Sequence, residues 1–221
     1  MRGLRALYDS VMDHKRLTSI APDWVRVFSN EEGREVGEML AASFAWLGHC
    51  GALALLDDNT SNFPMLATAS PLLGYVFEIR HDDDPVVLAR SMENFVGLAE
   101  RVWSAGGELG EEHALGATRS EQDELAAAWL FSSCEGDDPG LIVAAQLTGD
   151  AWPDLLLPVI DTEDFDSTWA REAAARRLAA IGDERALPAL TRLAERQADS
   201  QDGRAARRAI DAIHRRLAIE E

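Results

Sequence analysis

Cysteine, lysine and long apolar runs are all scarce in this sequence, and each shortage argues against a class of protein. The two cysteines, Cys50 and Cys134, stand alone and far apart, which matches neither a zinc site nor a disulfide framework. The longest apolar runs, such as 51–56, fall far short of the roughly 20 residues that span a bilayer. The first residues also lack the apolar core of a signal peptide. We therefore expect a soluble cytoplasmic protein without a membrane partner.

Catalytic motifs are missing as well. The five histidines occur in no His-x-x-x-His arrangement, and the chain has no Cys-x-x-Cys or Gly-x-Ser-x-Gly segment. His49 and Cys50 are adjacent, but neighbours along a strand point in opposite directions, so we do not expect a catalytic dyad. The only lysine is Lys15, and the glycines at 106–107 do not follow a strand or carry a phosphate-loop lysine. The sequence predicts no enzyme, no cofactor and no metal site.

Positive charge is the other shortage, since 39 acidic residues stand against 21 basic ones and the formal charge is -18. The imbalance is greatest in residues 111–168, which hold 14 acids and one base, whereas residues 169–221 hold 9 acids and 11 bases. Such a chain repels nucleic-acid phosphates and attracts basic proteins. Acidic surfaces also keep proteins soluble, which is the simpler interpretation. We expect a basic protein partner and no nucleic acid.

The first half of the chain mixes helical and strand patterns. Residues 1–50 are mostly of helical type, and the helix expected at 31–42 has Val36, Met39 and Leu40 on one face. Residues 44–49 show no clear pattern. Short apolar runs separated by Asp, Asn, Ser, Pro and Gly then predict a meandering antiparallel sheet, with strands at 53–56, 64–68, 75–79 and 85–89. Ser91 is placed to cap a helix that ends at Gly106.

The segment His81-Asp82-Asp83-Asp84 allows two interpretations. A histidine beside three aspartates is compatible with a metal or acid–base site. A metal site, however, needs further ligands at the correct spacing, and the sequence does not supply them. The segment lies between two predicted strands and precedes a proline, which is typical of a turn. We therefore predict a turn.

The second half repeats itself. Residues 147–150 resemble residues 180–183, and residues 155–158 resemble residues 185–188, which gives a period near 30. Two helices per repeat of this length are typical of an α-solenoid. The last predicted helix has an apolar face opposite an arginine face, and we expect the arginine face to be solvated. The arginines are Arg204, Arg207, Arg208 and Arg215.

Two families resemble parts of this chain. The segment AREAAARRLAAIGDERALPALTRLAER (170–196) resembles HEAT repeats. Three segments, LLDDNTSNFPML (55–66), PLLGYVFEIRHDDDPVVLA (71–89) and SMENFVGLAE (91–100), are similar to the SUKH superfamily of Smi/Knr-like proteins. The second resemblance implies an α+β domain that binds other proteins. Many bacterial members of that superfamily are immunity proteins, each of which neutralises a cognate toxin, often a nuclease.

These observations predict an α+β fold in three parts: a SUKH-like domain at 1–106 with an antiparallel sheet flanked by helices, a linker at 107–120, and a HEAT-like helical repeat at 121–221. The expected function is neutralisation of a basic toxin by binding. A HEAT-type scaffold for another protein is the alternative, and a small hydrolase is a third interpretation. The predicted partner-binding residues are the acids of three loops together with one aromatic residue. They are Asp57, Asp58, Asp82, Asp83, Asp84, Asp161, Glu163, Asp164, Phe165 and Asp166.

Overall fold

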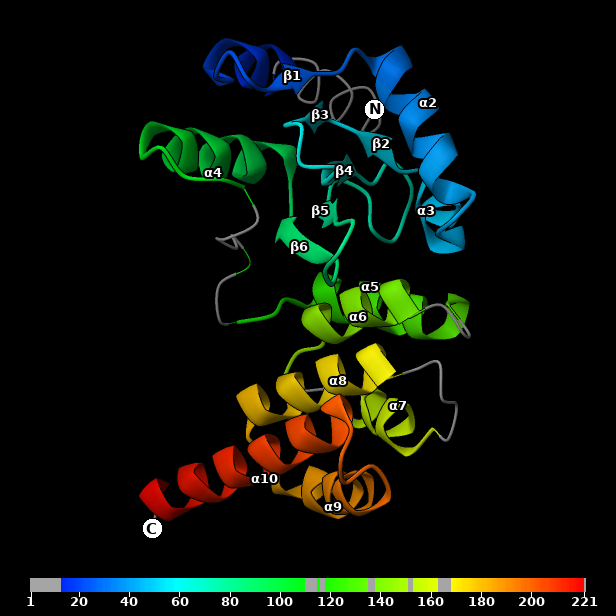
Figure 1. The fold of residues 1–221 in the computed structure, drawn as a ribbon, viewed down its shortest axis with the longest axis vertical. Coiled ribbons are helices and arrows are strands. Elements are labelled where there is room, and N and C mark those ends of the chain that lie inside the picture. The colour runs from blue at the N-terminus through cyan, green and yellow to red at the C-terminus, as the bar shows by residue number, and fades with distance from the viewer. Residues whose placement is uncertain are drawn as a thin grey trace. The chain divides into compact units, whose positions relative to one another are not determined.

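The chain folds into two compact units, Met1–Ala117 and Thr118–Glu221 (Figure 1). The computed structural model describes residues 13–109, 115, 118–134, 138–150, 153–162 and 168–220. The boundary between the units falls within the segment that the sequence marks as a linker. The first unit contains antiparallel sheets with helices, and the second is helical, so the predicted α+β fold class is confirmed.

The first unit begins, in its described part, with a helix at 13–20. The elements that follow it are β1 (Arg26–Val27), α2 (Asn30–Ala41), α3 (Ala45–Cys50), β2 (Leu53–Ala54), β3 (Leu56–Asp57), β4 (Phe63–Leu66), β5 (Val76–Ile79), β6 (Val86–Ala89) and α4 (Met92–Ser104).

The predicted meander is present as a four-stranded sheet of order β2-β4-β5-β6, in which every neighbouring pair is antiparallel. The predicted strand at 53–56 is divided in two, because β3 leaves this sheet and pairs with β1. In the register of β4 and β5, Phe63 lies opposite Ile79. All residues of β5 and β6 are buried, so both faces of the sheet are covered.

A different helix covers each face of the sheet. The apolar side of α4, including Phe95 and Val96, belongs to the same core as Val76 and Val86. On the opposite face, Trp46 of α3 packs against Phe77 with 4.8 Å between the ring centroids. Strand residues alternate between faces, so this arrangement puts Phe77 on the α3 side and its neighbours in β5 on the α4 side. Figure 1 shows α4 and α3 on opposite sides of the strands.

Helix α2 packs through glycine rather than through its large apolar residues. Met39, which the periodicity puts on one face with Val36 and Leu40, is 60% exposed. The buried residues of α2 are Gly33 and Gly37. A Cβ atom at Gly37 would lie 2.1 Å from the carbonyl oxygen of Ala52, so only glycine lets the helix backbone lie directly on the strand. A search for apolar periodicity overlooks such a face.

Helix α4 begins and ends as the sequence predicts. The Ser91 side chain accepts a hydrogen bond from the Asn94 backbone N–H at 3.2 Å, which is an N-cap. The helix ends at Ser104, and Gly106 follows with a φ of 73°. Residues 44–49, which have no clear sequence pattern, lie mostly in α3.

The second unit consists of α5 (Glu121–Ser133), α6 (Asp138–Leu147), the short 3-10 helix η1 (Pro153–Leu155), α7 (Leu157–Asp161), α8 (Thr168–Ile181), the 3-10 helix η3 (Glu184–Ala186), α9 (Leu187–Arg196) and α10 (Gln201–Glu220). The repeat seen in the sequence is visible here. The order α6, η1, α7 recurs as α8, η3, α9, and Pro158 and Pro188 occupy the same place in the first turns of α7 and α9.

Arginines of one helix bind the carbonyls at the end of another throughout this unit. Arg177 donates to the Thr148 carbonyl at 2.6 Å, and Arg216 donates to the Ile181 carbonyl at 2.8 Å. Arg196 does the same at the end of α7, with 3.0 Å to the Ile160 carbonyl. These guanidinium groups satisfy helix-terminal acceptors that have no partner within their own helix.

The predicted solvated arginine face of α10 also makes contacts with neighbouring helices, one to a backbone carbonyl and one to a carboxylate. Arg207 donates to the Ala194 carbonyl at 3.2 Å, and Arg208 lies 3.7 Å from the Glu172 carboxylate. Both arginines are exposed, so the face is solvated and also tied to its neighbours.

One ion pair of the second unit is fully buried. Arg171 Nε donates to Asp202 Oδ2 at 2.6 Å, and the two side chains are 1% and 0% exposed. The carboxylate also accepts a hydrogen bond from the Gly203 backbone N–H at 2.9 Å. The pair therefore joins α8 to the first turn of α10 in a place where water cannot replace either partner.

Two glycine-to-alanine substitutions test the glycine face. Gly37→Ala should lower the free energy of unfolding by about 1–3 kcal/mol, because its new methyl group collides with the Ala52 carbonyl. Gly97→Ala is the matched control in the interior of α4, where a Cβ atom meets nothing within 4 Å. It should raise stability by up to about 1 kcal/mol through helix propensity. Urea denaturation measures both, and equal effects of the two substitutions would contradict the packing described.

The buried ion pair gives a second test. Arg171→Met leaves the Asp202 carboxylate buried without its partner, and we expect a loss of about 3–5 kcal/mol. Arg192→Met is the control, because Arg192 and Asp161 form an ion pair at 2.8 Å whose side chains are 56% and 43% exposed. That exposed pair should contribute less than about 1 kcal/mol. Thermal and urea unfolding of both variants check the difference.

Candidate functional site

Two acidic loops meet at one end of the four-stranded sheet. Because Phe63 of β4 pairs with Ile79 of β5, the residue before β4 lies beside the residues that follow β5. The His81 backbone N–H accordingly donates to Asn62 Oδ1 at 3.3 Å. The loop that contains Asp57 and Asp58 therefore shares this end of the sheet with the segment 80–85. The sequence alone does not reveal this proximity.

The predicted turn after β5 is confirmed, since residues 80–85 connect the antiparallel strands β5 and β6. His81 Nδ1 lies 2.8 Å from Asp82 Oδ1, and both side chains are largely exposed. Arg80 donates to Asp83 Oδ2 at 3.1 Å, and the other oxygen of Asp83 accepts the Asp84 backbone N–H at 2.8 Å. The aspartates thus combine turn formation with an exposed negative surface.

The acids of the loop before β4, Asp57 and Asp58, accept hydrogen bonds from the backbone of their own loop. Asp57 Oδ1 accepts the Asn59 backbone N–H at 2.8 Å. Asp58 accepts the Thr60 backbone N–H at 3.1 Å and also the Thr60 hydroxyl. Asp58 is only 9% exposed, whereas Asp57 is partly exposed. Of the two predicted partner-binding residues in this loop, Asp57 is therefore the one that lies near solvent.

An exposed tryptophan is joined to the same loop through its backbone. The Asn59 amide donates to the Trp24 backbone carbonyl at 3.2 Å, and Trp24 is 46% exposed. Trp24 is not among the partner-binding residues predicted from the sequence. Tryptophan is nevertheless one of the residue types enriched at the centres of protein interfaces.

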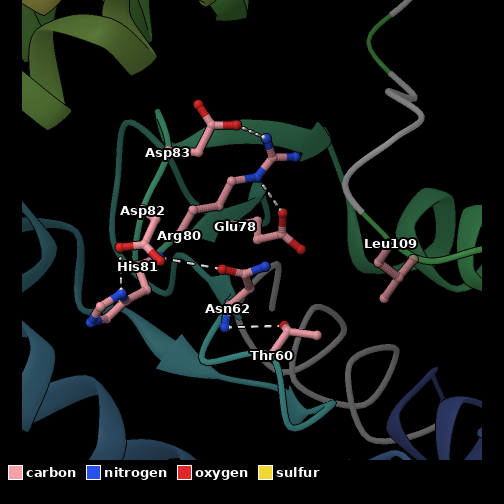
Figure 2. A pocket seen from close by; sticks show the side chains of 8 residues that line it. All are labelled: Thr60, Asn62, Glu78, Arg80, His81, Asp82, Asp83 and Leu109. Atoms are coloured by element: carbon pink, nitrogen blue, oxygen red, sulfur yellow. Dashed lines mark hydrogen bonds and ion pairs between the residues drawn. The ribbon is translucent and has the colours of Figure 1, made fainter.

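A pocket of about 430 Å³ opens between the two loops. Figure 2 shows its lining side chains, with the Arg80 guanidinium between the carboxylates of Glu78 and Asp83. Most of the lining is polar, and Leu109 supplies an apolar wall. The lining residues are Thr60, Asn62, Glu78, Arg80, His81, Asp82, Asp83 and Leu109.

Glu78 is the most deeply buried of these residues, with 1% of its surface exposed. Its Oε2 atom accepts a hydrogen bond from Arg80 Nε at 2.7 Å. Its Oε1 atom is buried and has no hydrogen-bond partner within the described part of the chain. Burial raises the pKa of Glu78 above the usual value, against the hydrogen bond and positive charge of Arg80, and the nearby Asp58 and Asp83 carboxylates raise it further.

The sequence does contain a signal for Glu78, although it is easily overlooked. Side chains alternate between the two faces of a strand, and Glu78 lies on the face opposite to Tyr75, Phe77 and Ile79. Alternation alone therefore assigns Glu78 to a solvated face. The informative feature is Arg80, which follows at the i+2 position and therefore lies on the same face as Glu78. A lone acid and a lone base at this spacing in an apolar strand indicate a buried pair.

Carboxylates outnumber cations among the described residues that line the pocket. His81 is paired with an exposed aspartate, and the Thr60 hydroxyl donates to the Asp58 carboxylate. In the ranges that the structure describes, no group of three or more His, Cys, Asp or Glu side chains is arranged to hold a metal ion. What the pocket offers is carboxylate, in excess over the single guanidinium of Arg80.

The remaining predicted partner-binding residues belong to the second unit. Asp161, at the end of α7, accepts hydrogen bonds from Arg192 of α9 at 2.8 and 2.9 Å, so it joins the equivalent helices of two repeats. Its side chain remains partly exposed. Glu163, Asp164, Phe165 and Asp166 lie outside the described residues.

Comparison of the chain with protein-family models, with curated proteins and with solved structures finds no match. The resemblances to the SUKH superfamily and to HEAT repeats therefore stay predictions from sequence. In the part of the chain that the structure covers, none of the helices combines the length and the apolar character needed to cross a bilayer.

The raised pKa of Glu78 gives a pH-dependent test. As pH rises above about 4.5, Glu78 loses its proton in the unfolded chain before it does so in the folded chain. The unfolded state is thereby favoured, so the free energy of unfolding falls relative to that of a variant without this carboxyl group. The stability of the natural chain minus that of Glu78→Gln should therefore fall between about pH 4 and pH 7. Urea denaturation across this range measures the difference. A difference that rises or stays constant with pH would contradict the burial of an ionisable carboxyl group here.

Proposed function

We propose that this chain is a cytoplasmic, non-enzymatic protein that binds a basic protein, most plausibly as an immunity protein that neutralises a basic toxin. The observation that carries the proposal is the convergence of two acidic loops at one end of the sheet. Asp82 and Asp83 are exposed there, Asp57 is partly exposed, and the exposed Trp24 is joined to Asn59 of the same loop through its backbone carbonyl. Exposed carboxylates form a surface that a cationic protein can bind, and tryptophan is a residue type enriched at the centres of interfaces.

The charge distribution supports the same conclusion. A formal charge of -18 draws a basic protein toward the chain before contact is made. A nuclease toxin is usually basic where it holds phosphate, so an acidic protein that covers that surface blocks its activity. The resemblance of residues 55–66, 71–89 and 91–100 to the SUKH superfamily agrees with this role.

The second unit is a poor candidate for binding nucleic acid. Its arginines are engaged within the unit, as Arg177, Arg196 and Arg216 are with helix-end carbonyls. Arg171 is buried against Asp202, and Arg192 pairs with Asp161. A nucleic-acid-binding repeat instead needs a stripe of cations free to contact phosphates. We propose that this unit supports protein binding, as in the HEAT-type alternative.

Salt dependence tests the proposed function. The product of the neighbouring gene is the first partner to examine, because immunity genes are expected next to toxin genes. We expect tight 1:1 binding whose association rate falls at least about tenfold between low and high salt. Surface plasmon resonance at several ionic strengths measures the rate. Absence of binding would contradict the immunity role, and a rate independent of salt would contradict electrostatic capture.

Charge reversal locates the surface. The double variant Asp82→Lys and Asp83→Lys should slow association about tenfold or more with little effect on dissociation. The matched control is Glu35→Lys with Glu38→Lys on the exposed side of α2, which changes the net charge by the same amount elsewhere. If both variants slowed association equally, the attraction would depend on net charge alone. That result would contradict a binding surface at this end of the sheet.

A further inference from the structure

The pocket between the acidic loops contains an unusual carboxylate. Glu78 is 1% exposed, and its Oε1 atom has no hydrogen-bond partner among the residues described. Buried carboxylate oxygens are nearly always paired, because an unpaired one forfeits its hydration without compensation. Arg80 satisfies only the other oxygen. Glu78 therefore has an acceptor to offer to a ligand in the pocket that it lines.

The surroundings determine the charge of that ligand. Among the described residues, Arg80 is the one arginine or lysine that lines the pocket, and it already lies between Glu78 and Asp83. Asp82 and Asp83 lie at the exposed rim, and Asp58 is close enough to Glu78 to influence its pKa. An anion in the pocket would meet the three carboxylates of Glu78, Asp82 and Asp83 against one guanidinium. A cation is therefore the ligand that the pocket attracts.

The shape and lining of the pocket narrow the choice of cation. The volume of about 430 Å³ has room for a long side chain, and Leu109 supplies an apolar wall for its methylene groups. A guanidinium presents several donors in one plane, pairs with carboxylates at two points and is less strongly hydrated than an ammonium group. These properties match a buried oxygen at the base and carboxylates at the rim.

We propose that this pocket binds an arginine side chain of the partner, with Asp82 and Asp83 at the rim and Glu78 at the base. The inference rests on the proposed function and adds the chemistry of recognition to it. Oε1 is closed to water in the free chain, so the incoming guanidinium can reach it only after a neighbouring side chain moves. In this proposal the Arg80 side chain turns outward along Asp83 and uncovers the Glu78 carboxylate.

Short blocked peptides serve as probes of the full chain. The arginine peptide acetyl-Gly-Arg-Gly-amide is titrated beside its citrulline analogue, which has the same shape and no charge. The ¹³C resonance of the Glu78 carboxyl group, assigned by its loss in Glu78→Gln, reports contact. We expect saturable shifts with the arginine peptide and binding at least fivefold weaker with citrulline. Equal binding of both peptides, or no shift of this resonance, would overturn the proposal.

A matched pair of variants adds a second test. Glu78→Gln keeps the shape of the side chain and removes its charge, so it should weaken binding of the arginine peptide about tenfold, as followed by the amide resonances of Asn62 and Asp83. Glu35→Gln removes one charge from the exposed surface of α2 and should bind as the natural chain does. Equal weakening by both substitutions would also overturn the proposal. If Glu78→Gln does not fold, the comparison of the arginine and citrulline peptides on the natural chain still tests the proposal.

The two proposals fail in different ways. If the arginine peptide does not bind but a basic protein still associates through Asp82 and Asp83, the pocket inference is wrong and the proposed function stands. If the peptide binds at Glu78 and no basic protein associates with the chain, the proposed function is wrong and the arginine pocket stands.

Discussion

The antiparallel pairing of β4 with β5 is the constraint on which the candidate site depends. Its register places Phe63 opposite Ile79, which brings the loop before β4 beside the turn after β5. The same register directs Glu78 and Arg80 to the α4 side of the sheet. A slip of one residue would exchange the two faces and leave this carboxylate beside Trp46. Packing on both sides of the strands prevents that slip, because Phe77 fills the α3 side and Val76 fills the α4 side.

The acidic residues of the chain have two physical roles that net charge does not distinguish. Asp58 and Asp202 are buried and hold neighbouring backbone or side-chain groups in place. Asp82 and Asp83 lie at the surface, where their charge acts over a longer distance. Acids of the first kind are fixed within the fold, whereas acids of the second kind are available to contact a partner. This division explains why position, rather than number, defines the candidate surface.

Sequence patterns predicted the fold class, the meander, the turn at 80–85 and the cap at Ser91, because each depends on local chemistry. They failed where packing between distant residues decides the outcome. The face of α2 is set by the approach of Gly37 to the Ala52 carbonyl, which no periodicity records. The two acidic loops were recognised separately, but their proximity depends on strand register. Glu78 was overlooked because its burial follows from a helix, α4, that lies later in the chain.

The arginine contacts of the helical unit bear on how such a unit changes in length during evolution. Each guanidinium, such as Arg177 or Arg216, comes from one helix and binds the last carbonyls of another in the stack. A duplicated helix pair would therefore bring its own donor and its own acceptors. Backbone carbonyls are present whatever the side chain, so the contact survives sequence divergence at the acceptor positions. Growth or loss of repeats can then occur without leaving unpaired groups at the new junction.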